Sequence, residues 1–323
     1  MSTNLWFFMS NNLYQRKSIS KFFLFFLIIG ATNCASTIHK TGLMWERSRA
    51  DLSKKEIQVG NFNWVYLEGG DGKEIALTIH GFGGDKDHFT RFARYISDDY
   101  HVISPDLPGF GENSRIPGES YSIQTQVKRL HDFALAIGIK KYHILGNSMG
   151  GSLVGVYAAT YPEEVTSVTF FDNAGIQSPE PSELYKLVKE GKPNPLLVGS
   201  VEDFDRLLQF SFVKPPYLPG SLKTYFTERA IKNRDWNESI LKEIRAEGYI
   251  LEPLLWKIQS PALVIWGKED RIIHHSSTIP MDKKIKAPHK IIIMPEVGHA
   301  PMIEVPKESA SLWLEWQASL QNK

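Results

Sequence analysis

The sequence predicts an α/β fold: a mostly parallel central sheet, covered by helices on both faces, with a helical lid inserted between two strands. Short apolar runs rich in β-branched residues alternate with helical patterns, as in parallel sheets buried under helices. One long segment, residues 175–256, breaks this alternation because it contains helical patterns and no strand pattern. With 323 residues, 42% of them hydrophobic, the chain can bury a sizeable core.

The strand predictions follow the apolar runs in chain order. Residues 57–59 and 63–67 are expected to form two strands joined by a turn at Gly60-Asn61. The remaining runs are of the buried parallel type. They are residues 75–79, 102–104, 142–145, 165–171, 263–266 and 290–294.

Helices are expected between these strands. Ser122 is a plausible N-cap for a helix that buries one apolar face and ends at Gly138. Residues 148–161 form a second helix, stopped by Pro162, and a last helix begins near Pro306. Residues from about 40 to 55 are expected to be a polar helical lead-in.

The segment 175–256, called the lid segment below, contains four helical pieces punctuated by prolines. Its aromatic and aliphatic content argues against a disordered linker. The pieces are residues 183–190, 202–212, 222–233 and 236–247. The expected organisation is a leader (1–34), a lead-in (35–55), a core (56–174 and 257–323) and this lid segment (175–256).

The N-terminal residues have the order of an export signal. Basic residues precede an apolar run at 22–29, and small residues then lead to Cys34. The run is shorter than the ~20 apolar residues that a spanning helix needs. The segment resembles a bacterial lipobox with Cys34 as the lipidated residue, although Ala31 and Asn33 depart from the pattern. We expect an exported or membrane-associated protein, with cleavage without lipidation or an uncleaved anchor as the alternatives.

Composition narrows the function classes. Lys and Arg total 37 against 36 Asp and Glu, so the net charge is only +1. This balance lacks the excess of positive charge that is typical of nucleic-acid-binding proteins. A single cysteine excludes an internal disulfide framework. His274 and His275 are adjacent, which does not place both on one helical face, and no spacing suggests a metal site. No cofactor and no obligate protein partner is expected.

The decisive local motif is Gly146-Asn147-Ser148-Met149-Gly150-Gly151, between a predicted strand and a predicted helix. A serine at such a corner takes up a strained turn, and the flanking glycines leave room for the close approach of the backbone. The turn exposes the hydroxyl, and the helix N-terminus favours negative charge nearby. Ser148 is therefore the predicted nucleophile.

A serine nucleophile needs a base and an acid that orients it, and here the expected order is Ser, acid, His. Asp270 and His299 both follow predicted strands, at the edge where open α/β sheets bind ligands. They are the predicted acid and base. Glu269 and Asp172 are the rival acids, and Asp172 stays open because it ends the strand after the nucleophile helix.

Backbone donors must stabilise the developing oxyanion. The amides of Met149 and Phe82 are the candidates, the latter in the loop His80-Gly-Phe-Gly-Gly84. His80 is interpreted as a brace for that loop. The glycine-rich loop 106–111 lacks the Lys-Ser/Thr of a phosphate cradle and is interpreted as packing beside the site.

Together the motifs HGFGG, DLPGFG, GNSMGG, WGKED and GHAPMIEVP resemble the α/β-hydrolase superfamily from about residue 57 to the end. Within it the chain looks most like bacterial cold-adapted-type lipases and is similar to membrane-anchored monoacylglycerol lipases. The resemblance implies a Ser148–Asp270–His299 triad and hydrolysis of acyl esters. Fold alone does not fix the substrate.

The expected function is therefore that of a carboxylic ester hydrolase acting on small-molecule or lipid esters through an acyl-enzyme. One alternative is a C–C bond hydrolase of ring-cleavage products, since those enzymes carry a similar nucleophile motif. They typically have an aromatic residue after the catalytic histidine, where this chain has Ala300. A second alternative is a ligand-binding receptor of the same fold with little turnover.

Overall fold

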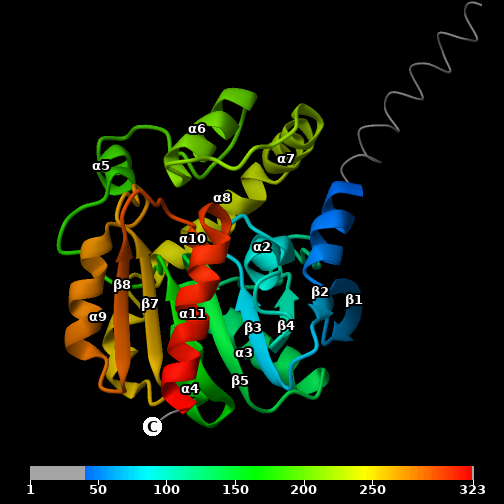
Figure 1. Ribbon diagram of the computed structural model, residues 1–323. Helices are drawn as coiled ribbons and strands as arrows, with labels where there is room; N and C mark the ends of the chain where they lie inside the picture. The colour runs from blue at the N-terminus through cyan, green and yellow to red at the C-terminus, as the bar shows by residue number, and fades with distance from the viewer. Residues whose placement is uncertain (1–40, 322–323) are drawn as a thin grey trace, which may run out of the picture.

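A computed structural model describes residues 41–321 of the chain. Its centre is a single sheet of eight strands in the order β1-β2-β4-β3-β5-β6-β7-β8 (Figure 1). The strands are β1 (Leu52–Val59), β2 (Phe62–Gly69), β3 (Glu74–Ile79), β4 (Tyr100–Pro105), β5 (Tyr142–Asn147), β6 (Val165–Phe171), β7 (Ala262–Gly267) and β8 (His289–Met294).

The sheet is mostly parallel, as predicted. β1 pairs with β2, and β2 with β4, in the antiparallel sense, whereas all other neighbours are parallel. The carboxyl ends of β3, β5, β6, β7 and β8 therefore meet at one edge of the sheet. Each loop that carries a predicted site residue leaves the sheet at this edge.

One part of the lead-in prediction is wrong. Residues 41–49 are helical, but β1 begins at Leu52, inside the stretch expected to be helical. Leu52 is buried and pairs with Gly69 of β2, whereas the next four residues of β1 are exposed. An edge strand held by backbone pairing alone shows no apolar alternation in its sequence, which explains the error.

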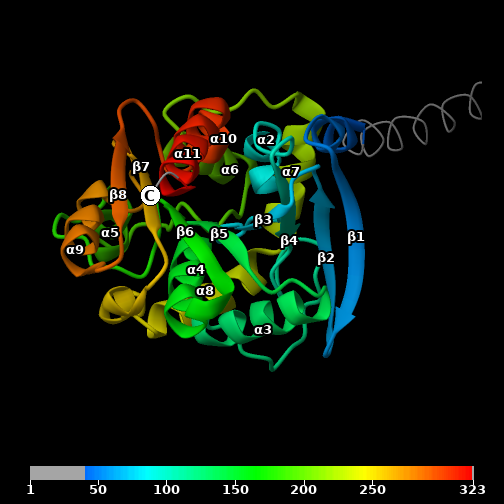
Figure 2. The same cartoon turned by 60° about the horizontal axis from the view of Figure 1, so that its bottom comes forward.

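Helices cover both faces of the sheet (Figure 2). One face carries α3 (Ile123–Ala136), α4 (Met149–Thr160) and α9 (Thr278–Lys284), whose buried side chains share one hydrophobic cluster. The other face carries α2 (Thr90–Ala93), α10 (Pro301–Glu304) and α11 (Pro306–Gln321), which share a second cluster. Short 3₁₀ helices complete the structure: η1 (Lys86–Phe89), η2 (Pro162–Glu164), η3 (Glu252–Lys257) and η4 (His275–Ser277).

The predicted ends of α3 are confirmed. The Ser122 hydroxyl accepts a hydrogen bond from the Thr125 amide at 3.2 Å, as an N-cap does. Gly138 follows the helix with a positive φ of 80°, and its amide donates to the Leu135 carbonyl. This left-handed residue ends the helix.

Between β6 and β7 the chain forms four helices, all above one end of the sheet in Figure 1. They are α5 (Glu183–Lys189), α6 (Val201–Ser211), α7 (Gly220–Lys232) and α8 (Arg234–Ala246). The four helical pieces expected in the lid segment are therefore confirmed. Their movement as a lid, and the domain boundaries expected around them, stay predictions.

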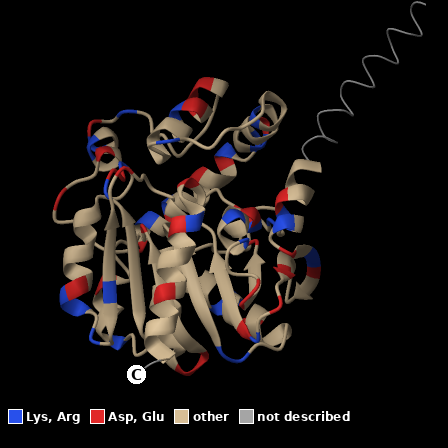
Figure 3. Cartoon of the chain, viewed as in Figure 1, with Lys and Arg blue, Asp and Glu red and all other residues tan. Residues whose placement is uncertain are grey.

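Charges of both signs are interspersed over the surface elements in Figure 3, in keeping with the balance of 37 basic and 36 acidic residues. Within residues 41–321, no helix has the length and apolar character needed to cross a bilayer. The predicted leader and Cys34 lie outside the described residues.

Candidate active site

Ser148 occupies the corner between β5 and α4, with φ of 54° and ψ of −117°. A non-glycine residue with positive φ is strained, and such strain is typical of functional sites. The neighbouring glycines make the corner possible. A Cβ on Gly146 would lie 2.3 Å from the Gly150 carbonyl oxygen, and one on Gly150 would lie 2.4 Å from the carbonyl oxygens of Ile79 and His80.

Hydrogen bonds hold the strained backbone in place. The Ser148 amide donates to the Phe171 carbonyl at 3.0 Å. The Ser148 carbonyl accepts from the amides of Ser152 at 3.1 Å and Ala174 at 2.9 Å. Ser148 is thus tied to the end of β6 as well as to its own helix.

The structure brings His299 and Asp270 together, from the loops after β8 and β7. The Nδ1–H of His299 donates to Oδ2 of Asp270 at 2.7 Å, and both side chains are buried. Oδ1 of Asp270 accepts the amides of Ile272 at 2.8 Å and Ile273 at 3.0 Å. Glu269, the rival next to Asp270, is exposed. The Asp270 carboxylate is therefore held in one orientation and orients the imidazole in turn.

The backbone of His299 is also fixed on both sides. The Asn147 side chain donates to the His299 carbonyl at 3.0 Å. The His299 amide donates to the carbonyl of Ser211, the last residue of α6, at 2.8 Å. The predicted base is thus held by the residue beside Ser148 and by the lid segment.

Asp172, the alternative acid, lies beside Asp270 and His299. Its side chain is fully buried, and its Oδ1 accepts the Gly267 amide at 2.9 Å. One carboxylate oxygen each of Asp172 and Asp270 and one imidazole nitrogen of His299 all lie within 4.8 Å of one another. Burial, and next the neighbouring charge of Asp270, raise the pKa of Asp172 well above its ordinary value. The Nδ1–H of His299 donates its hydrogen bond to Asp270 and not to Asp172.

The expected oxyanion donors lie beside Ser148. A Cβ on Gly81 would approach the Ser148 Cβ to 3.2 Å, so the loop that carries Phe82 packs directly against Ser148. Among the residues that the structure describes, the backbone N–H groups of Phe82 and Met149 donate no hydrogen bond. Both N–H groups are free to bind an incoming oxygen, and their role stays a prediction.

His80 braces this loop, as the sequence indicated. Its Nδ1–H donates to the Gly81 carbonyl at 2.7 Å, and its Nε2 accepts the Leu107 amide at 3.1 Å. Burial lowers the pKa of His80 to about 3, so the ring is neutral at physiological pH. Its two hydrogen bonds join the glycine-rich loop to the loop after β4.

The loop 106–111 is also structural. Asp106 is buried, accepts the amides of Lys86 and Glu112, and forms an ion pair with the Lys86 ammonium at 2.9 Å. Burial raises the pKa of Asp106 to about 6 despite the opposing effect of Lys86. The interpretation of this loop as packing beside the site is confirmed.

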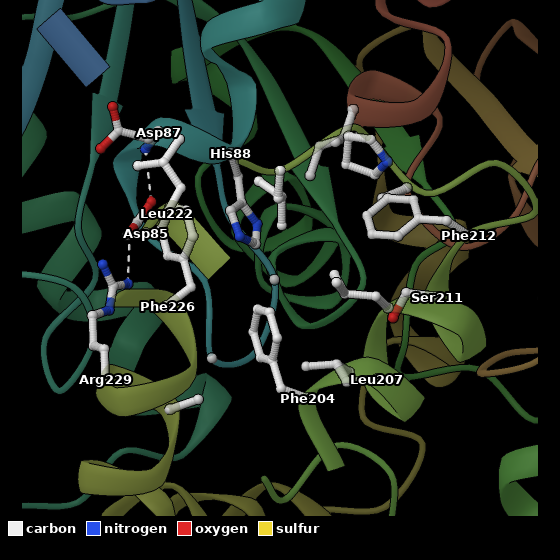
Figure 4. Close-up of a pocket in the computed structure, with 18 of the residues that line it drawn as sticks. Asp85, Asp87, His88, Phe204, Leu207, Ser211, Phe212, Leu222, Phe226 and Arg229 are labelled. Atoms are coloured by element: carbon white, nitrogen blue, oxygen red, sulfur yellow. Dashed lines mark hydrogen bonds and ion pairs between the residues drawn. The ribbon is translucent and has the colours of Figure 1, made fainter. Parts of the chain in front are cut away.

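A cavity of about 760 Å³ opens at the site, within the size range of pockets for small molecules. Ser148, Phe82 and His299 line it, together with side chains from α6 and α7 (Figure 4). Those from the lid segment are mostly apolar: Leu196, Val198, Phe204, Leu207, Leu208, Phe212, Leu222 and Phe226. The lid segment therefore supplies an apolar wall facing the predicted nucleophile.

Two polar features of the cavity were not identified from the sequence. Arg229 of α7 forms an ion pair at 2.5 Å with Asp85, which follows the glycine-rich loop (Figure 4). His88 also lines the cavity, and its buried Nδ1 has no partner within the described residues. Asp85 and Arg229 are 144 residues apart, and no local sequence pattern predicts an ion pair between residues so distant in the chain.

Comparisons with known proteins agree with this geometry. Residues 77–306 match the alpha/beta hydrolase fold family. The chain belongs to the α/β-hydrolase fold family. Lipase 1 of Psychrobacter immobilis is 38% identical over 303 residues, which cover 91% of this chain and 94% of the relative. Monoacylglycerol lipase abhd6-B of Xenopus laevis is 30% identical over 292 residues, 86% of each chain.

A solved structure is similar as well. The crystal structure of a membrane phospholipase A, described as a bacterial virulence factor, is 40% identical with a TM-score of 0.91. The match covers 96% of this chain and 100% of that chain. The predicted resemblance to lipases of the α/β-hydrolase family, the fold class and the assignment as a hydrolytic enzyme are confirmed.

Proposed function

We propose that this α/β-hydrolase is a carboxylic ester hydrolase that works through an acyl-enzyme on Ser148, with His299 as base and Asp270 as orienting acid. One observation carries the proposal. The imidazole, held by Asp270 at 2.7 Å, lines the same cavity as a serine in a strained nucleophile turn. Nucleophile, base and orienting acid are the parts that acyl transfer requires.

The chemistry follows from these positions. The Nε2 of His299 takes the proton of Ser148 as its Oγ attacks the ester carbonyl carbon. The amides of Phe82 and Met149 stabilise the oxyanion, and the helix N-terminus at Met149 adds a favourable field. The alcohol leaves with the proton from His299. Water, deprotonated by the same imidazole, then releases the acid and restores the serine hydroxyl.

Three observations support a lipid ester as the substrate. The cavity wall from α6 and α7 is apolar, as acyl chains require. Its volume of about 760 Å³ exceeds what a small acyl group fills. The relatives at 38% and 30% identity are named lipase and monoacylglycerol lipase. We assign the physiological substrate to medium- or long-chain acyl esters.

We also propose that the protein is exported or held at a membrane by its N-terminal leader, with Cys34 as the lipidated residue. The order of basic, apolar and small residues before Cys34 supports this assignment. One similar structure is titled a membrane phospholipase A. A membrane location would place the enzyme beside its lipid esters.

A substrate panel tests the proposed function. Purified protein is assayed with p-nitrophenyl esters of increasing chain length and with monoacylglycerols, and kcat/KM should rise from acetyl to longer chains. The Ser148→Ala variant should lose about 10⁶ in kcat, as loss of a triad serine does in comparable enzymes. Turnover of a ring-cleavage dienoate without turnover of any ester would instead identify a C–C hydrolase, and full activity of Ser148→Ala would exclude the mechanism.

A further inference from the structure

Beside the proposed triad the structure places a second carboxyl group, that of Asp172, which the mechanism does not use. It lies at the end of β6 with a positive φ of 45° and no exposed surface. Its Oδ1 accepts the Gly267 amide at 2.9 Å. Its Oδ2 is buried and finds no donor among residues 41–321. A buried carboxylate oxygen without a donor is costly, so this atom requires an explanation.

The neighbour of this oxygen is the carboxyl group of Asp270. The two side chains are within hydrogen-bonding contact, and they and His299 have polar atoms within 4.8 Å of one another. Two ionised carboxylates cannot share such a buried site, because their repulsion drives a proton onto one of them. A proton between them also provides the donor that the Oδ2 of Asp172 lacks.

The surrounding groups decide which carboxyl carries the proton. Asp270 accepts three hydrogen bonds, from the amides of Ile272 and Ile273 and from the Nδ1–H of His299, and these stabilise its anion. Asp172 accepts only the Gly267 amide and also lies in the field of Glu304. The charged or titratable neighbours of Asp172 are thus Asp270, His299 and Glu304, and the two acidic ones favour its neutral form.

We propose that Asp172 is a neutral carboxylic acid that donates a hydrogen bond to the Asp270 carboxylate and so positions the acid that orients His299. This inference rests on the proposed function, because it assigns a role within the same site. Asp172 is a positioning residue: it acts through Asp270 and touches neither the nucleophile nor the base as a hydrogen-bond partner. The hydrogen bond that it donates also reduces the negative charge that Asp270 presents to the imidazole.

Two substitutions of Asp172 separate this role from the alternatives. Asp172→Asn keeps an acceptor for the Gly267 amide and an N–H donor for Asp270, so kcat should stay within roughly threefold of wild type. Asp172→Ala removes the donor, so kcat should fall about 10- to 100-fold, as loss of one hydrogen bond to a charged group predicts, with KM little changed. Asp270→Asn serves as the reference and should lose about 10⁴.

The dependence of kcat/KM on pH distinguishes this positioning role from a purely structural one, which would leave the profile unchanged. Without the hydrogen bond from Asp172, the Asp270 carboxylate presents its full negative charge to the imidazole, which favours the protonated form of the base. The acid limb of the kcat/KM profile should therefore shift to higher pH in Asp172→Ala and stay in place in Asp172→Asn. Melting curves identify any variant that fails to fold.

An infrared difference spectrum of wild type against Asp172→Asn tests the protonation directly, without any substrate. At neutral pH the spectrum should contain the carbonyl stretch of a protonated carboxylic acid that the variant lacks. Absence of that band, a loss in Asp172→Asn equal to that in Asp270→Asn, or wild-type kinetics in Asp172→Ala would each overturn the proposal. If Ser148→Ala retained ester turnover while the band was present, the proposed function would fail and the protonation of Asp172 would stand.

Discussion

At the scale of single residues, His80 couples the loop of Phe82, a proposed oxyanion donor, to the loop after β4 while staying uncharged. Burial lowers its pKa to about 3, against about 6.5 in an unfolded chain. Between these values the unfolded state binds a proton that the folded state does not. The stability provided by the neutral ring is therefore complete above about pH 6.5 and is lost progressively as the pH falls toward 3.

A His80→Gln variant makes this dependence measurable. The free energy of unfolding of wild type should exceed that of the variant at pH 8. The difference should shrink by about 1.4 kcal/mol per pH unit below pH 6.5, since glutamine binds no proton. Urea unfolding of both proteins at pH 8, 6 and 5 measures the difference. Parallel pH dependences would show that His80 is protonated in the folded protein.

The sequence identified most of the residues at the site because each one belongs to a local motif. Ser148 lies in a glycine-flanked corner, and Asp270 and His299 follow recognisable strands. The contact of Asp172 with Asp270 could not be predicted, because it depends on how far two neighbouring strands extend before their loops turn. No pattern within either loop encodes that distance.

At the scale of elements, α7 is tied to the core by the ion pair between Arg229 and Asp85. Burial alone would raise the pKa of Asp85, but the Arg229 guanidinium holds it well below its ordinary range. Arg229→Met would leave a buried carboxylate without its ion-pair partner, so the free energy of unfolding should fall by roughly 3–5 kcal/mol. Hydrogen exchange of the backbone amides of α7 should also become faster.

Lys223→Met is the matched control on the same helix. Lys223 pairs with Asp205 of α6 at 2.6 Å, but both side chains are exposed by more than a third. Such surface pairs contribute less than about 1 kcal/mol, so this variant should unfold and exchange like wild type. Equal effects of the two variants would mean that the Asp85 pair does not fasten α7.

Helical patterns separated by prolines predicted the four helices of the lid segment to within a few residues. β1 was only partly predicted, since residues 53–56, which follow the buried Leu52, are polar or charged and exposed. The position of α7 over the cavity depends on the pairing of Arg229 with a loop 144 residues away. Elements were therefore easier to predict than their arrangement.

At the scale of the whole molecule, the order of strands is the part that the sequence left open. β4 lies between β2 and β3 in the sheet, although it follows both in the chain. The crossover from β3 to β4 requires a parallel pairing that apolar runs cannot distinguish from other orders. Composition, periodicity and the family motifs predicted the fold class, and the order of the strands comes from the structure.

The proposed attachment to a membrane also belongs to this scale. Bacterial cells that express the full chain and are fed a labelled fatty acid should yield labelled protein in the membrane fraction. A Cys34→Ala chain should carry no label, since Cys34 is the only cysteine. Unlabelled wild-type protein would exclude lipidation, and the mass of its mature N-terminus would then distinguish a cleaved signal from an uncleaved anchor.

The left-handed backbone at Ser148 also bears on how this protein can be engineered. Such a conformation costs an L-residue roughly 1–2 kcal/mol, and a glycine would adopt it freely. At position 148, a substitution that relieves backbone strain would therefore also remove the proposed nucleophile. Directed evolution for heat resistance alone would favour loss of this proposed nucleophile, so each round of such a selection has to reward turnover as well as survival.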